Sequence, residues 1–255
     1  DNVIRQAVTC LFAEGHLLIE DIPGVGKTTL ALCIARSLEL SFRRIQFTAD
    51  LLPSDILGVS IFNSKSNAFE LKSGPIFNHV VLADEINRSS PKTQSALLEA
   101  MNERQVSMDN ETRRLPDPFF VIATQNPHEH YGTYPLPESQ RDRFMMRISI
   151  GYPSEKEEKE ILRDEIDIRS VDSLAPVAKR ETVCDGIRLA RQVKVDESLD
   201  DYILKIVQET RVSPFVDMGV SPRGTLALRR AAQAGAYLNG RDYMDYKLES
   251  IHNKI

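Results

Sequence analysis

Two short segments of this 255-residue chain carry residues of the types that bind and cleave a nucleoside triphosphate. Gly24-Val25-Gly26-Lys27-Thr28-Thr29 follows the apolar run Leu17-Leu18-Ile19. A strand, a glycine turn and a helix in this order present backbone N–H groups and the positive end of the helix dipole to a phosphate chain. Asp84-Glu85 closes a second apolar run, Val80-Val81-Leu82-Ala83, and so places two carboxylates at the same edge of a parallel sheet. Together the two segments predict a nucleoside-triphosphate site.

The residue types suggest a role for each position. Lys27 is expected to reach the β- and γ-phosphates, while the Thr28 hydroxyl and Asp84 are candidate ligands of Mg²⁺. Glu85 is the candidate base or polariser of the attacking water. The predicted phosphate-binding residues are Pro23, Gly24, Val25, Gly26, Lys27, Thr28 and Thr29. Of these, Thr29 is turned about 100° around the helix from Thr28 and is expected to be mainly structural.

The loop departs from the usual pattern G-x-x-x-x-G-K-[ST] at one position. Because Gly26-Lys27-Thr28 sets the register, the first glycine would fall at Asp21. Pro23 and Gly24 supply the turn instead.

Three further polar residues are candidates for the same chemistry. Asn126 follows the apolar run that ends at Ala123, where an amide can orient a water, although a turn residue before Pro127 is the plain alternative. Arg143 could reach a phosphate on a neighbouring subunit, or could form an ordinary surface ion pair. Arg223 stands in the first turn of a predicted helix, where its charge opposes the dipole, and is a candidate phosphate sensor or a simple exposed arginine.

Composition restricts the class of protein. A net charge of −5 argues mildly against a general nucleic-acid coat. The three cysteines are odd in number and widely spaced, which favours reduced thiols in a cytoplasmic protein over a disulfide framework. No apolar run approaches the length of a membrane span and no signal peptide is visible, so membrane insertion is not expected.

Strands alternate with helices up to about residue 150, which predicts an α/β fold with a parallel sheet. Expected strands are 17–20, 44–48, 80–83, 119–123 and 144–150, and expected helices include 3–12, the segment after the glycine loop, and one capped by Ser90. Two alternating segments, about 57–72 and 104–116, read as hairpins inserted between these elements. After Pro153 the pattern is helical, with helices expected at 176–193, 197–210 and 222–238.

With these residues identified, the chain resembles the MoxR family of AAA+ ATPases from about Gly15 to Met244. The motifs that carry the resemblance are residues 20–28, 47–55, 74–77, 82–88, 123–127 and 132–138, and Asp21 is usual in such families. The resemblance implies a P-loop three-layer αβα domain over residues 1–151, with sheet order 5-1-4-3-2, and an all-α lid domain over residues 152–255. Asn126 then corresponds to sensor 1, Arg143 to the arginine finger and Arg223 to sensor 2.

The same resemblance implies ATP and Mg²⁺ as ligands and self-assembly into a ring, commonly a hexamer. Members act as chaperone-like remodellers of protein clients, often with a von Willebrand factor A domain partner, in cofactor insertion or complex maturation. It leaves open whether Arg223 acts on the nucleotide of its own subunit or of a neighbour.

Two other functions remain as alternatives. One is a DNA motor, with Lys65, Arg113 and Arg114 on or near the hairpins; the net charge and a lack of aromatic residues at the hairpin tips weigh against it. The other is a regulatory switch that binds nucleotide and turns it over slowly.

Overall fold

The computed structural model describes residues 2–64, 67–108, 111–127, 132–164, 171 and 173–245. Lys65 lies outside this range. The central element is a five-stranded sheet, formed by β1 (Leu17–Glu20), β2 (Phe42–Gln46), β5 (Val80–Asp84), β8 (Phe120–Gln125) and β9 (Met146–Ile148). Its order is β2-β5-β8-β1-β9 and every pairing is parallel. This is the expected order 5-1-4-3-2, with the five strands numbered along the chain.

Helices cover both faces of the sheet, as the continuous apolar strands require. Alternation along β1 shows the two sides: Leu17 and Ile19 belong to one apolar core and Leu18 to the other. The first core also contains residues of α1 (Asn2–Phe12) and α2 (Lys27–Ser37). The second contains residues of α3 (Pro53–Leu57), the 3₁₀ helix Ile86–Arg88 and α4 (Pro91–Glu103). The three-layer αβα architecture is therefore confirmed.

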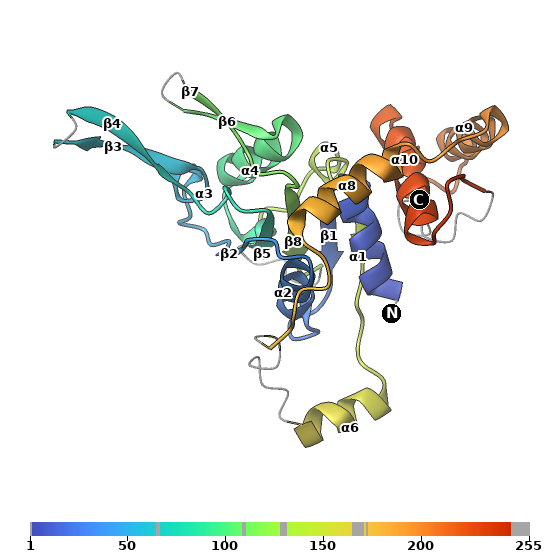
Figure 1. Cartoon of the computed structure of the whole chain (residues 1–255), viewed down its shortest axis with the longest axis horizontal. Coiled ribbons are helices and arrows are strands. Elements are labelled where there is room, and N and C mark those ends of the chain that lie inside the picture. Colours follow the sequence, from blue (N-terminus) through green and yellow to red (C-terminus); the bar gives the residue numbers. More distant parts are fainter. Residues whose placement is uncertain are drawn as a thin grey trace.

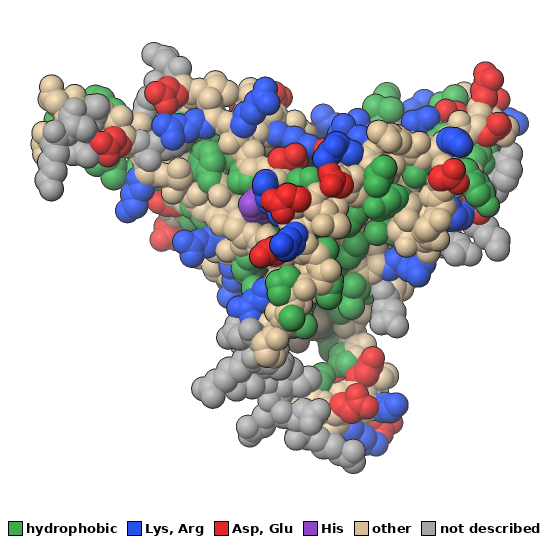
Figure 2. Space-filling model, in the orientation of Figure 1, with side chains coloured by type: hydrophobic (Ala, Val, Ile, Leu, Met, Phe, Trp, Pro, Cys, Tyr) green, Lys and Arg blue, Asp and Glu red, His purple; other side chains and the backbone are tan. Residues whose placement is uncertain are grey.

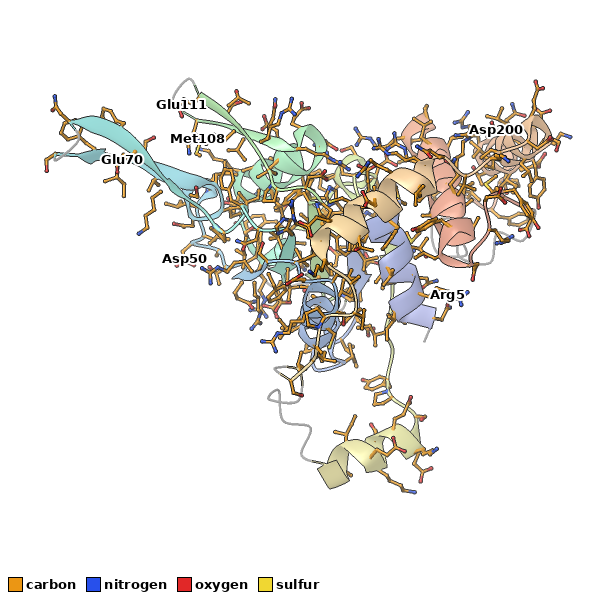
Figure 3. The ribbon with its side chains drawn as sticks, in the orientation of Figure 1. Arg5, Asp50, Glu70, Met108, Glu111 and Asp200 are labelled. Carbon is orange, nitrogen blue, oxygen red and sulfur yellow. The ribbon has the colours of Figure 1, made fainter. Side chains whose placement is uncertain are left out.

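Both predicted hairpins are present. β3 (Gly58–Asn63) pairs antiparallel with β4 (Ala68–Ser73), and β6 (Gln105–Met108) pairs antiparallel with β7 (Glu111–Arg114). Figure 1 shows the two hairpins projecting from the sheet at the upper left of the view. Figure 3 marks Glu70 on the first hairpin and Met108 and Glu111 on the second, well away from α9 at the opposite end.

The C-terminal part of the chain is helical, as expected. After α5 (Glu138–Arg141) and β9 come α6 (Glu155–Asp164), α8 (Arg180–Arg191), α9 (Glu197–Val212) and α10 (Pro222–Leu238). α6 stands apart from the rest of the molecule in Figure 1. The first apolar core continues from the sheet through α1 into α8, α9 and α10, so the helical region is packed against the sheet domain. No helix among the described residues is long and apolar enough to cross a membrane.

Several predicted boundaries were wrong; among them, the strand expected at 144–150 begins at Met146 and the strand expected at 119–123 is Phe120–Gln125. The second strand is Phe42–Gln46 and not 44–48, because its partner β5 begins opposite Phe42 and ends opposite Gln46. The helix expected from residue 176 begins at Arg180. The last strand stops at Ile148 instead of Ile150, because the N–H of Ile150 donates to the carboxylate of Asp21 rather than to a neighbouring strand.

Candidate active site

The glycine loop between β1 and α2 leaves the first turn of α2 open to a ligand. Gly24 and Gly26 adopt φ values of +86° and +89°, which favour glycine, and nothing lies within 4 Å of the position that a Cβ would take at either residue. Gly26 is the N-cap of α2 and has no side chain to satisfy the first N–H groups of the helix. These donors and the helix dipole suit a phosphate, so the loop fits the predicted ligand.

Lys27 lies at the start of α2 and close to the acidic strand ends. Its Nζ donates to the backbone carbonyl of Asp21 at 2.7 Å. Burial lowers the pKa of this amine, and the nearby carboxylates of Asp21, Asp84 and Glu85 act in the opposite direction. The structure therefore brings together the two segments that the sequence singled out.

Asp84 ends β5 and is a buried residue, 8 % exposed. Its Oδ1 accepts a hydrogen bond from Thr124 Oγ1 at 2.5 Å. Its Oδ2 accepts from Arg44 Nε at 3.0 Å and from Arg44 Nη2 at 2.5 Å. Carboxylate and hydroxyl oxygens are ligands that Mg²⁺ accepts, so Asp84 and the half-buried Thr28 could hold that ion once Arg44 releases Oδ2.

Glu85 is held in an unusual backbone conformation at the site. Its φ of 57° and ψ of 48° place it in the left-handed region, which a residue with a side chain rarely adopts. The Glu85 N–H donates to Thr124 Oγ1 at 2.9 Å, while Oε2 accepts from Gln46 Nε2 at 2.8 Å and pairs with Arg88 Nε at 3.1 Å. The same threonine hydroxyl thus contacts both carboxylate residues.

Sequence reasoning gave no role to Thr124, Arg44 or Gln46. The signal for Thr124 was available, since it is the first polar residue after the apolar run of β8, and Ala123 pairs with Ala83 in the neighbouring strand. The register then puts Thr124 beside Asp84. Asn126 follows β8 at the same edge of the sheet and is half-buried.

Arg143 and Arg223 line a single pocket of about 200 Å³, together with Glu14, Arg104 and Arg230. None of residues 23–29, all of which the structure describes, belongs to its lining. The Arg143 Nη1 donates to the carbonyl of Leu98 at 3.0 Å, while its buried Nε has no hydrogen-bond partner among the described residues.

A capping interaction holds the two arginine-bearing segments together. Ser221 is the N-cap of α10 and accepts the N–H of Gly224 at 3.0 Å. Its hydroxyl also donates to the carboxylate of Asp142, with distances of 2.9 and 3.0 Å to the two oxygens. Since Asp142 precedes Arg143 and Ser221 lies two residues before Arg223, this contact joins the two segments that carry the arginines.

Comparison with known proteins agrees with this architecture. The sequence model of the family described as "ATPase family associated with various cellular activities (AAA)" matches residues 16–146, and that of the "AAA lid domain" matches residues 208–245. The chain is 53 % identical over 243 residues to "Uncharacterized protein YeaC" of Bacillus subtilis, covering 95 % of this chain and 76 % of that protein. It is 42 % identical over 257 residues to "Chaperone MoxR1" of Mycobacterium tuberculosis, covering 96 % of this chain and 67 % of that protein.

A solved structure is also similar. The crystal structure of a putative ATPase from Cytophaga hutchinsonii superposes with a TM-score of 0.90 at 39 % identity, covering 98 % of this chain and 79 % of that one. Together with the glycine loop and the acidic strand end, these matches assign the class of protein. The chain belongs to the MoxR family of AAA+ ATPases.

Proposed function

We propose that this chain binds ATP and hydrolyses it to ADP and phosphate. The observation that carries the proposal is the meeting of the open N-terminus of α2, the Lys27 amine and the Asp84 and Glu85 carboxylates at one edge of the sheet. Positioning and electrostatic stabilisation provide most of the catalysis in phosphoryl transfer, and these groups supply both. AAA+ relatives and a protein named as a chaperone support the same activity.

Each residue has a distinct role in this proposal. Lys27 and the N–H groups of residues 24–29 hold the phosphates, Pro23 shapes the turn that presents them, and Thr28 and Asp84 hold Mg²⁺. The metal ion would neutralise charge on the transferred phosphoryl group. Glu85 polarises the attacking water, because its left-handed backbone holds the carboxylate beyond the end of β5. Asn126 orients that water from the end of the neighbouring strand.

We further propose that the active form is a ring, with six subunits as the expected number. Arg143 and Arg223 line a pocket that does not include their own nucleotide loop, so they are suited to a phosphate held by the next subunit. An arginine contributed in this way stabilises charge that develops during phosphoryl transfer.

The work done by the ring is proposed to be remodelling of a protein client in the cytoplasm. The name of the relative "Chaperone MoxR1" supports this direction. A von Willebrand factor A domain protein is the expected partner, and maturation or cofactor insertion is the expected outcome for the client.

Two variants test the ATPase proposal. Lys27→Ala should lose nucleotide binding, whereas Glu85→Gln should bind ATP but hydrolyse it very slowly. ATP binding by equilibrium dialysis and phosphate release would be measured in parallel. Unchanged turnover in the Glu85 variant would refute the assignment.

The client can be sought with the same variants. The ATP-locked Glu85→Gln protein is purified from its native lysate, with Lys27→Ala as the control, and the co-purifying proteins are identified by mass spectrometry.

A DNA motor is the second candidate, because the β3–β4 hairpin carries an aromatic pair that the sequence argument overlooked. The rings of Phe62 and Phe69 lie 5.4 Å apart and are 51 % and 74 % exposed, and exposed aromatic side chains can stack on bases. Against this, basic and acidic side chains are interspersed on the face shown in Figure 2, and the net charge is negative. Stimulation of the ATPase by DNA that weakens with added salt would favour the motor. If DNA does not stimulate the ATPase, turnover is slow and no protein is enriched with the ATP-locked variant, the regulatory switch is favoured.

A further inference from the structure

Asp21 stands where the usual phosphate-loop pattern has a glycine, and its side chain makes contacts that a glycine could not make. The residue is 8 % exposed. Its Oδ1 accepts the N–H of Ile22 at 2.9 Å. Its Oδ2 accepts the hydroxyl of Ser149 at 3.0 Å and the N–H groups of Ile150 at 2.6 Å and Gly151 at 2.7 Å. Three of its four donors therefore come from the segment that follows β9.

The main chain of Asp21 contacts two other parts of the site. Its carbonyl accepts the hydrogen bond from Lys27 Nζ at 2.7 Å, and its N–H donates to the carbonyl of Gln125, the last residue of β8, at 3.2 Å. One residue thus joins the phosphate-binding lysine, the end of a central strand and residues 149–151.

The four donors around the Asp21 carboxylate favour its ionised form. Burial would raise the pKa of the carboxyl, but the hydrogen bonds from Gly151, Ile22, Ser149 and Ile150 hold that pKa below its ordinary value. Hydrogen bonds to an ionised acceptor are about twice as strong as neutral ones. An asparagine of the same shape has one acceptor oxygen and a donor NH₂, so it cannot accept from both Ile22 and residues 149–151.

Residues 149–151 are where the chain leaves the sheet for the helical region. Gly151 has a φ of +76°, and α6 begins four residues later. Because the Asp21 carboxylate binds the residues just before this bend, the direction of the chain at its exit depends on the position of the phosphate loop. A phosphate that attracts the Lys27 ammonium would draw it away from the Asp21 carbonyl. The contacts of Asp21 would then change, and Asp21 is also the residue that binds residues 149–151.

We propose that Asp21 is a positioning residue that sets the phosphate loop for ATP and couples it to the exit of the chain at residues 149–151. The proposal rests on the proposed ATPase function. Its first consequence, protection of the exit segment by Asp21, does not require nucleotide and can be tested separately.

The test compares the full-length protein with Asp21→Asn and with Asp21→Gly, which restores the usual glycine. Asp196→Asn is the matched control, since Asp196 Oδ1 also accepts a backbone N–H, that of Ser198 at 3.0 Å, but at the start of α9. Hydrogen exchange of the peptide that contains Ile150 and Gly151 is measured without nucleotide. We expect exchange to be at least about tenfold faster in both Asp21 variants and unchanged in the control, since each amide loses a charge-assisted hydrogen bond.

The second measurement separates KM from kcat. Both Asp21 variants should show a KM for ATP raised by roughly tenfold, with kcat changed by less than about threefold, because Glu85 and Lys27 remain in place. In the Glu85→Gln background, ATP should alter exchange at residues 149–151 when Asp21 is present and should not do so after Asp21→Asn. Ser149→Ala, which removes a single donor, provides a milder variant if either Asp21 substitution prevents folding.

Two results would overturn the proposal. One is wild-type KM and wild-type exchange in Asp21→Asn, Asp21→Gly and Ser149→Ala. The other is an equal rise in KM in Asp196→Asn, which would indicate general destabilisation. If the wild-type chain binds no ATP, the ATPase proposal fails, whereas the nucleotide-free exchange experiment still decides whether Asp21 holds the exit segment.

Discussion

Arg44 and Asp84 form an ion pair at the edge of the sheet where the metal ligand is expected, with Nη2 of the arginine 2.5 Å from Oδ2 of the aspartate. Arg44 is half exposed, while Asp84 is almost buried, so the pair joins the surface of β2 to the interior of the site. In the proposed site Mg²⁺ would bind this carboxylate, and the guanidinium already occupies one of its two oxygens. The two cations would therefore compete for Asp84.

This competition predicts that removal of Arg44 relaxes the requirement for the metal. Arg44→Met should lower the Mg²⁺ concentration that gives half-maximal ATPase activity by about two- to fivefold, because a half-exposed ion pair contributes up to about 1 kcal/mol. Mg²⁺ titrations at saturating ATP would measure the shift. Arg43→Met, on the same strand, is the control and should show no shift. A higher Mg²⁺ requirement in Arg44→Met would mean that the arginine supports the metal site and does not compete with it.

Thr124 is expected to be needed for catalysis although it contacts no substrate. Thr124→Val removes the donor to Asp84 and leaves the N–H of Glu85 without its acceptor, so both carboxylates lose orientation. We expect kcat to fall by roughly 10- to 100-fold, the usual effect of losing a group that orients a metal ligand, and stability to fall by about 1–3 kcal/mol. Thr124→Ser keeps the hydroxyl and should lose far less activity. Equal activity in the valine and serine variants, measured by phosphate release, would contradict this role.

The phosphate loop and Asp84-Glu85 could be found from sequence because each is a local pattern at the end of an apolar strand. Their meeting also followed from the sequence, since parallel strands end at one edge of a sheet. The strand order did not follow from spacing and came from the family resemblance. The structure confirms it.

The contacts between side chains could not be predicted in the same way. The Arg44–Asp84 ion pair and the hydrogen bonds of Thr124 to Asp84 and Glu85 depend on the register of β2, β5 and β8. A local sequence pattern does not predict that register. The predicted end of the last strand was wrong because the buried carboxylate of Asp21 accepts the N–H of Ile150. In the sequence, Asp21 is visible only as the residue that replaces the first glycine of the loop pattern, which does not indicate this contact.

Arg143 provides a direct test of whether neighbouring subunits share a site. Arg143→Ala should bind ATP and lose turnover, and Lys27→Ala should lose both. In an equal mixture of the two variants, about a quarter of the interfaces would pair an intact loop with an intact arginine, so about a quarter of wild-type turnover should return if assembly is random. ATPase assays of mixtures across several ratios would measure the recovery. No recovery in rings shown to contain both variants would refute a shared site.

Arg223 is expected to behave as Arg143 does, because the two side chains line the same pocket. An Arg223→Ala subunit retains its own loop and can receive an intact Arg223 from a Lys27→Ala neighbour. Recovery of turnover in this mixture is therefore the expected result. An arginine that acts on the nucleotide of its own subunit would give no recovery, since neither variant would then contain a complete site. Arg229→Ala is a suitable control, because the Arg229 guanidinium binds Asp200 at 2.7 Å. This variant should keep its ATPase turnover without a Lys27→Ala neighbour.

His16 should make the fold sensitive to mild acid. His16 lies immediately before β1 and is almost completely buried, with Nδ1 accepting the N–H of Val121 at 3.1 Å and Nε2 3.2 Å from the carbonyl of Met101. Burial lowers the pKa from 6.5 to about 4, the Met101 carbonyl partly opposes that shift, and the charge of Arg104 adds to it. Below pH 6.5 the unfolded chain binds a proton that the folded protein excludes, so the free energy of unfolding should fall with pH by about 1.4 kcal/mol per unit until pH approaches 4. Urea unfolding between pH 7.5 and 4.5 would measure this slope, with His16→Gln as the reference because its neutral amide does not titrate. The difference in the free energy of unfolding between the two proteins at each pH isolates the contribution of His16 from that of other acid-sensitive groups. If the two free energies fall in parallel with pH, the buried ring is not the source of the effect.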